Sequence, residues 1–141
     1  MGEVRWNPDG LLPEPIRVSV ISVHLDFSRK KVRDAQIEEM RVMLPDIATP
    51  VIILGDFNTD WSKDESALRA IAKNGNLKVY QPESEVLGTY KEGKHRLDWI
   101  LISKELEFVS CEVTRVVLSD HMPVQATLRL VDVSDKEKDS Y

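Results

Sequence analysis

The sequence predicts an α/β (α+β) fold, in which helices cover one face of a mixed β-sheet. Residues 17–24, 51–54 and 97–102 form apolar runs that are hydrophobic on both sides, which is typical of strands inside a covered sheet. Segments 29–44 and 66–74 have helical periodicity instead. The resulting order, β-α-β-α-β followed by three strands, indicates a mixed sheet rather than a purely parallel or antiparallel one.

The first elements have clear boundaries. Residues 1–16 are expected to be an irregular lead-in, because Pro8, Pro13 and Pro15 lie around Asp9-Gly10, a dipeptide typical of turns. The strand at 17–24 leads into the helix at 29–44, for which Ser28 is the expected N-cap. The strand at 51–54 is stopped by Gly55.

The second part of the chain alternates between strands and loops. Ser62, Lys63, Asp64 and Glu65 form a predicted capping box before the helix at 66–74. Four strands are then expected, and the charged tail at 132–141 is expected to be mobile because it lacks apolar anchors. The strands lie at 77–80, 97–102, 107–118 and 123–130. The predicted domain therefore covers residues 17–131.

Composition limits the class of protein. The length of 141 residues suits one domain, and the net charge of −5 argues against a general nucleic-acid coat, which would carry a basic field. No apolar run is long enough to span a membrane or resembles a signal peptide, and Cys111 is the one cysteine, so an internal disulfide is excluded. We therefore expect a buried, inert thiol and a cytoplasmic location.

The predicted sheet has one apolar face too many for its helices. Two helices cover one side, whereas at least three strands are apolar on both sides. An uncovered face of this kind would exceed the apolar patches usual on monomers. We therefore expect the chain to self-associate through the sheet.

The string Gly55-Asp56-Phe57-Asn58 is the most specific chemical signal. A glycine after a buried strand permits a sharp turn, which directs a carboxylate and an amide into one cleft. The Asp56 carboxylate could bind a hard cation or orient a water, and the Asn58 amide could bind metal or phosphate without adding charge. The alternative is an ordinary Asp–Asn turn that satisfies its own backbone.

Three further positions place polar groups at the ends of strands. Ser119-Asp120-His121 follows a predicted strand, and its imidazole suits proton transfer near neutral pH. Asp98 interrupts an apolar strand, where a carboxylate is costly unless paired; a surface position at a strand edge is the alternative. His24 ends the strand at 17–24, where a lone histidine is more often structural.

Four strings, together, resemble the second half of the endonuclease/exonuclease/phosphatase superfamily, the metal-dependent hydrolases that include pancreatic deoxyribonuclease and the apurinic endonucleases. The resemblance runs from about Arg17 to Leu130. It implies that this chain forms half of a four-layer α/β/β/α sandwich, because the family's first half, with an early Asn and a metal-binding Glu, has no counterpart here. The strings are Val23-His24-Leu25, Gly55-Asp56-Phe57-Asn58, Leu97-Asp98-Trp99-Ile100 and Ser119-Asp120-His121.

The resemblance implies a Mg²⁺- or Mn²⁺-dependent hydrolase of phosphate esters. Its metal ligands would be Asp56, Asn58 and Asp120. Its substrate would be nucleic acid, a nucleotide or a phospholipid head group, and its partner would be a missing N-terminal half. The alternative is a catalytically silent half-domain that acts as a structural or interaction module.

The resemblance also implies the catalytic roles. Asp56 would bind or orient the attacking water, Asn58 would orient the water or the phosphate, and Asp98 and His121 would form the proton-handling pair. His24 would stabilise charge on phosphorus.

Other residues near family positions have weaker expectations. Arg33 and Gln36, on the first predicted helix, are expected to give packing and polar support. Thr89, Tyr90 and Arg96 are substrate-side candidates. Trp61 is expected to pack in the interior and His95 to be a solvated loop residue.

Overall fold

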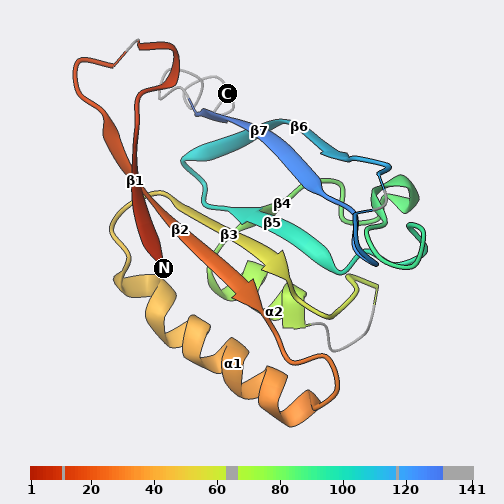
Figure 1. The fold of residues 1–141 in the computed structure, drawn as a ribbon. Coiled ribbons are helices and arrows are strands. Elements are labelled where there is room, and N and C mark those ends of the chain that lie inside the picture. Colours follow the sequence, from red (N-terminus) through yellow and green to blue (C-terminus); the bar gives the residue numbers. More distant parts are fainter. Residues whose placement is uncertain (11, 63–66, 117, 132–141) are drawn as a thin grey trace, which may run out of the picture.

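The computed structural model describes residues 1–10, 12–62, 67–116 and 118–131 and has three layers (Figure 1). Helices α1 (Lys30–Met43) and α2 (Ala67–Asn74) pack on one face of a five-stranded sheet. A two-stranded sheet lies over the other face. Within the described ranges, no helix is long and apolar enough to cross a bilayer.

The five-stranded sheet is mixed, as predicted. Its strand order is β1-β2-β3-β5-β4. Strands β2 and β3 are parallel and are connected through α1, whereas the other pairs are antiparallel. The strand bounds are β1 Gly2–Trp6, β2 Ile16–His24, β3 Val51–Asp56, β4 Lys78–Val79 and β5 Asp98–Ile102. The predicted fold class, a mixed sheet with helices on one face, is therefore confirmed.

The expectation of an irregular lead-in is wrong for residues Gly2–Trp6. These residues form β1, which pairs antiparallel with β2 from Gly2 against Val20 to Trp6 against Ile16. Val4 and Trp6 are the period-2 apolar positions of this strand. The prolines that suggested irregularity are confined to the connection between β1 and β2.

The last two strands leave the main sheet. A tight turn, in which the Leu106 N–H donates to the carbonyl of Ser103 at 3.0 Å, sends the chain back across the sheet. Strand β6 (Leu106–Val113) then pairs with β7 (Val124–Leu130) as a separate sheet. The predicted strand at 107–118 thus ends at Val113. It belongs to the two-stranded sheet rather than to the main sheet.

This second layer covers part of the apolar face that was expected to be bare. Side chains from β6 and β7 pack against Val18 and Ile102 of the main sheet. The expectation that nothing in the chain covers this face is therefore wrong in part. The packing residues from the second layer are Leu106, Phe108, Leu128 and Leu130.

The main core lies between the five-stranded sheet and the helices. Ile53 and Leu101 from the sheet and Leu68 and Ile71 from α2 are fully buried there. Trp61 packs against this cluster, as expected. Burying each such side chain stabilises the fold by roughly 1.5–3 kcal/mol, so the sheet is a rigid platform for its loops.

The start of α1 differs in detail from the expectation. Its N-cap is Arg29, which makes no side-chain capping bond, rather than Ser28. The Asp26 carboxylate instead accepts the backbone N–H groups of Ser28 and Arg29, at 3.0 and 2.6 Å. Most of the predicted capping box at 62–65 and the predicted mobile tail at 132–141 lie outside the described residues.

Gly55 allows β2 and β3 to approach at the end that carries the polar residues. It pairs with Val23 and has φ of 137°. A Cβ atom at this position would lie 2.0 Å from the Val23 carbonyl oxygen. Both the backbone conformation and the space therefore require glycine.

We predict that Gly55→Ala destabilises the protein by roughly 3 kcal/mol or more, because backbone strain adds to a clash with main-chain atoms. Gly10→Ala is the matched control: Gly10 also has positive φ, at 65°, but nothing lies within 4 Å of its Cβ position. This control should cost about 1 kcal/mol. Urea unfolding of both variants checks the difference, and equal losses would contradict it.

We predict self-association through the apolar groove that β7 leaves open over β1 and β2. This cavity of about 430 Å³ is lined by Val4, Trp6, Val18, Val20, Ile52, Ala126, Thr127 and Leu128. Light scattering at roughly 100 µM should show dimers, since apolar burial drives association, and Val4→Lys should give monomers. Val109→Lys, at a similarly exposed valine on β6, should stay dimeric. A monomeric wild-type chain would contradict this prediction.

Candidate catalytic site

Strand register places three site residues in a row across one end of the sheet. His24 of β2 pairs with Asp56 of β3, and Asp56 pairs in turn with Asp98 of β5. Directly opposed residues on neighbouring strands project to the same face. The His24 Nε2 atom lies 3.6 Å from Asp56 Oδ2.

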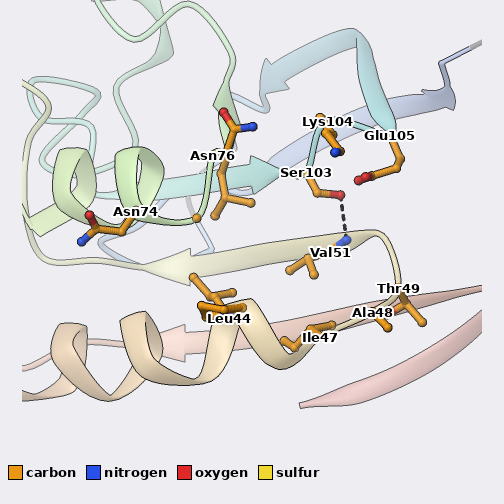
Figure 2. A pocket seen from close by; sticks show the side chains of 13 residues that line it. Leu44, Ile47, Ala48, Thr49, Val51, Asn74, Asn76, Ser103, Lys104 and Glu105 are labelled. Atoms are coloured by element: carbon orange, nitrogen blue, oxygen red, sulfur yellow. Dashed lines mark hydrogen bonds between the residues drawn. The ribbon is translucent and has the colours of Figure 1, made fainter.

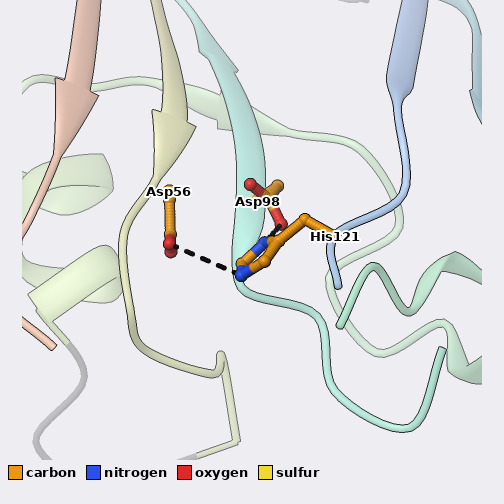
Figure 3. Close-up of side chains that lie close together, drawn as sticks. All are labelled: Asp56, Asp98 and His121. Carbon is orange, nitrogen blue, oxygen red and sulfur yellow. Dashed lines mark hydrogen bonds and ion pairs between the residues drawn. The ribbon is translucent and has the colours of Figure 1, made fainter. Parts of the chain in front are cut away.

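His121 completes this row from the segment before β7 (Figure 3). Its Nδ1 atom lies 2.7 Å from Asp98 Oδ2, and its Nε2 atom lies 3.9 Å from Asp56 Oδ2. The Tyr90 ring packs on the imidazole with centroids 4.8 Å apart. The predicted hydrogen bond between Asp98 and His121 is therefore confirmed.

Thr89 fixes the orientation of Asp98. Its side chain is fully buried, and its hydroxyl donates to Asp98 Oδ2 at 2.6 Å while accepting the backbone N–H groups of Leu97 and Asp98 at 3.1 and 3.2 Å. Asp98 Oδ2 thus accepts from both Thr89 and His121. This arrangement keeps the proton on His121 Nδ1, so that Nε2 of the neutral ring is free to accept one.

The surroundings of His121 favour its protonated form. Burial lowers the pKa of the imidazole, but the hydrogen bond and charge of Asp98 and the charges of Asp56 and Asp120 outweigh burial. The pKa of His121 is therefore raised above its ordinary value of 6.5. A base with this property is well suited to proton transfer near neutral pH.

The turn at Asp56 and Asn58 has the hydrogen bond of an ordinary Asp–Asn turn, and both side chains still line the cleft. The Asn58 backbone N–H donates to Asp56 Oδ1 at 2.8 Å, as in an ordinary Asp–Asn turn. The Asn58 side-chain amide donates to the Leu25 carbonyl oxygen at 2.8 Å. This bond fixes the amide and leaves its Oδ1 as an acceptor, while Asp56 Oδ2 lies near the two histidines.

All six residues singled out by the sequence line one open cleft of about 720 Å³. Residues from three strand ends and two loops thus converge on one cleft. Asp120 contributes an exposed carboxylate. The six are His24, Asp56, Asn58, Asp98, Asp120 and His121, and the cleft is also lined by Phe27, Tyr90, Lys91, His95, Leu97 and Ser119.

Two of the weaker candidates support the neighbouring loop, as expected. Gln36 accepts the Asp26 backbone N–H at 2.9 Å, and Arg33 donates to the Asp26 carbonyl oxygen at 2.7 Å. Tyr90 lines the cleft and so does His95, whose expected exposure is confirmed but whose position at the cleft was missed.

Arg96 does not reach the cleft. Its guanidinium lies 3.9 Å over the Trp99 ring and donates to the Gln81 carbonyl oxygen at 2.9 Å. Burial lowers the pKa of Arg96 to about 10, and the Asp60 carboxylate offsets only part of this effect. The structure thus places Arg96 in the packing behind the site, and the position of Thr89 against Asp98 is the feature that sequence reasoning did not resolve.

A second cavity, of about 310 Å³, lies at the opposite ends of β3 and β5 (Figure 2). There the Ser103 hydroxyl accepts the Val51 backbone N–H at 2.9 Å. None of the six sequence-predicted residues lines it. The six residues therefore line a different cleft from this cavity.

The cleft contains donors for a divalent cation. Ligand atoms of Asp56, Asp98 and His121 lie within 4.8 Å of one another. Each carboxylate has one oxygen that accepts hydrogen bonds, Asp98 Oδ2 from Thr89 and His121 and Asp56 Oδ1 from the Asn58 N–H. Carboxylate oxygens are hard donors of the kind that bind divalent cations.

We predict that Asp98→Asn lowers the pKa of His121 in the metal-free protein. Loss of the Asp98 charge and hydrogen bond removes the main groups that raise this pKa. Because the pKa is raised on folding, the pair stabilises the protein below about pH 6.5, and this contribution is lost as pH rises through the folded-state value. Asp98→Asn should therefore cost more stability at about pH 6 than at about pH 9.

An NMR titration of the imidazole and urea unfolding at both pH values check this prediction. Asp34→Asn, an exposed substitution on α1, is the control and should leave the pKa of His121 unchanged. A wild-type His121 that titrates at or below its ordinary value would contradict the proposed electrostatics.

The fold is shared with several solved structures at low sequence identity. A functionally unknown conserved protein from Enterococcus faecalis V583 has a TM-score of 0.65 and 20% identity, over 86% of this chain and 52% of that one. The mannosyl-6-phosphatase Bt3783 of Bacteroides thetaiotaomicron VPI-5482 has a TM-score of 0.60 and 22% identity, over 82% of this chain and 52% of that one. The human Nocturnin catalytic domain, solved with a bound sulfate anion, has a TM-score of 0.61 and 19% identity, over 92% of this chain and 51% of that one.

The chain thus spans about half the length of these structures. No curated protein sequence matches it. The sequence model of the endonuclease/exonuclease/phosphatase family matches residues 6–121, which is most of the chain and includes all six site residues. With the rim geometry and the shared fold, this match shows that the chain belongs to the endonuclease/exonuclease/phosphatase family.

Proposed function

We propose that this chain hydrolyses phosphate esters, either phosphodiesters or phosphomonoesters, with Mg²⁺ or Mn²⁺ bound at the rim of the sheet. The observation that carries the proposal is the hydrogen-bonded chain from Thr89 through Asp98 to His121, which ends 3.9 Å from Asp56. An oriented imidazole beside a second carboxylate is the arrangement that activates a water molecule. Family membership supports the reaction class.

The metal ligands in this proposal are Asp56, Asn58 and Asp120. Asp56 offers a carboxylate that is not committed to the Thr89 chain, Asn58 offers the oxygen of a fixed amide, and Asp120 lines the same cleft. Mg²⁺ is commonly held by one or two carboxylates with water and substrate oxygens completing its shell. When bound, the cation supplies Lewis-acid chemistry and offsets the charge of the phosphoryl group.

His121 acts as the general base. Its Nε2 atom takes a proton from the water that Asp56 orients, and Asp98 stabilises the imidazolium that results. The water oxygen forms a bond to phosphorus while the bond from phosphorus to the ester oxygen breaks. The departing oxygen takes a proton from solvent, to which the cleft is open, and the exposed His24 stabilises charge on the phosphoryl group.

The substrate class in this proposal includes nucleic acids, nucleotides and phospholipid head groups. The net charge of −5 does not oppose such anions, because a bound cation inverts the local field. Selection among these substrates depends on the loops that surround the rim.

A second candidate function follows from length. The chain spans about half the length of the solved structures that share its fold. In this alternative the chain is a catalytically silent half-domain that acts as a structural or interaction module.

We predict metal-dependent turnover of bis-p-nitrophenyl phosphate or p-nitrophenyl phosphate that is abolished by a chelator. His121→Ala should lower the rate by about 10²–10⁴-fold, the usual contribution of a general base. Asp34→Asn, on the exposed face of α1, should retain the wild-type rate. Initial rates with Mg²⁺ and Mn²⁺ measure these effects. Wild-type turnover no faster than that of His121→Ala would favour the silent module.

A further inference from the structure

Phe27 is an exposed aromatic side chain on the wall of the cleft. It is 79% exposed and is the one aromatic among the exposed large hydrophobic residues of the described ranges. It lines the same cavity as His24 and Asp56. A phenylalanine in this position presents a flat aromatic face to any ligand that enters the cleft.

The loop around Phe27 is fixed rather than free. On one side, the Asp26 backbone is held by Gln36 and Arg33, at 2.9 and 2.7 Å. On the other side, the backbone N–H groups of Ser28 and Arg29 donate to the Asp26 carboxylate at 3.0 and 2.6 Å. Phe27 is therefore presented outward by neighbours that are themselves pinned, which lowers the entropy lost when a ligand stacks on it.

The position of Phe27 indicates the part of the substrate that it meets. Asp56 Oδ2 lies between two imidazoles, 3.9 Å from His121 Nε2 and 3.6 Å from His24 Nε2. In phosphoryl transfer the attacking and departing oxygens lie roughly in line on phosphorus. If water enters beside His121, the departing group lies on the side of His24, and Phe27 follows His24 by three residues on the β2–α1 loop.

We propose that Phe27 is a stacking residue that makes this cleft selective for phosphate esters whose organic group carries a planar aromatic ring, such as a nucleobase. This inference rests on the proposed function for the location of the phosphate. Bases stack on exposed aromatic side chains without regard to their hydrogen-bonding pattern. A phospholipid head group or a simple sugar phosphate lacks such a ring and gains nothing from Phe27.

The test is a binding comparison between two ligands that differ only in the base. We use the non-hydrolysable methylenephosphonate analogues of AMP and of ribose 5-phosphate, with Mg²⁺, in calorimetric titrations. The wild-type protein should bind the AMP analogue about tenfold more tightly, a typical effect of one stacked base. Phe27→Ala should remove this preference without changing affinity for the ribose analogue, and Phe27→Trp should preserve it.

Val42→Ala is the matched control, because Val42 is a similarly exposed apolar residue, on α1; it should alter neither affinity. Equal binding of the two analogues by the wild type, no binding of either, or an equal loss of both in Phe27→Ala would overturn the proposal. Hydrolysis is measured separately. Base preference without turnover would contradict the proposed function alone, whereas turnover without base preference would contradict the role of Phe27 alone.

Discussion

The close approach of β2 and β3 at Gly55 is the constraint on which the rest of the site depends. With no side chain at this position, the two parallel strands stay paired as far as His24 and Asp56. Antiparallel pairing with β5 then brings Asp98 into the same row. Because buried side chains beneath the sheet leave little freedom to these backbones, the row of polar groups is set by packing that precedes any ligand.

The site brings three carboxylates together, and a neutral hydroxyl, that of Thr89, orients one of them, Asp98. Asp56, Asp98 and Asp120 all act on His121, and together they raise its pKa despite its partial burial. Thr89 adds a hydrogen bond without adding charge. A rim of this composition repels itself in the absence of a cation, and such repulsion is the usual cost of a functional site. Binding of a divalent cation would relieve it, so metal and site geometry are expected to support each other.

The sequence predicts the elements that carry the site and misses some that complete the fold. Strands β2, β3 and β5 are apolar on both faces, and each begins or ends at a polar residue, so their type and their shared rim could be inferred. Strand β1 was missed because the prolines that follow it obscured the alternation of Val4 and Trp6. The second layer was missed because the turn at Ser103 determines a change of sheet, which no local pattern reports.

Individual side chains show the same division. The pairing of Asp98 with His121 follows from the cost of burying a lone carboxylate, and the structure has that bond at 2.7 Å. The contact of Thr89 with Asp98 joins residues from a loop and a strand, so it depends on tertiary folding rather than on spacing. The exposure of Phe27 likewise depends on the hydrogen bonds of Asp26, which become visible once α1 is in place.

Paramagnetic broadening by Mn²⁺ in a ¹H–¹⁵N correlation spectrum is the most direct test that the rim is a metal-dependent site. Amide signals near Asp56, Asn58 and Asp120 should broaden first as Mn²⁺ is added, and excess Mg²⁺ should restore them. Amides around Ser103, at the opposite end of the sheet, should keep their intensity. Broadening that begins at Ser103, or that spreads evenly over the acidic surface, would contradict a metal site at this rim.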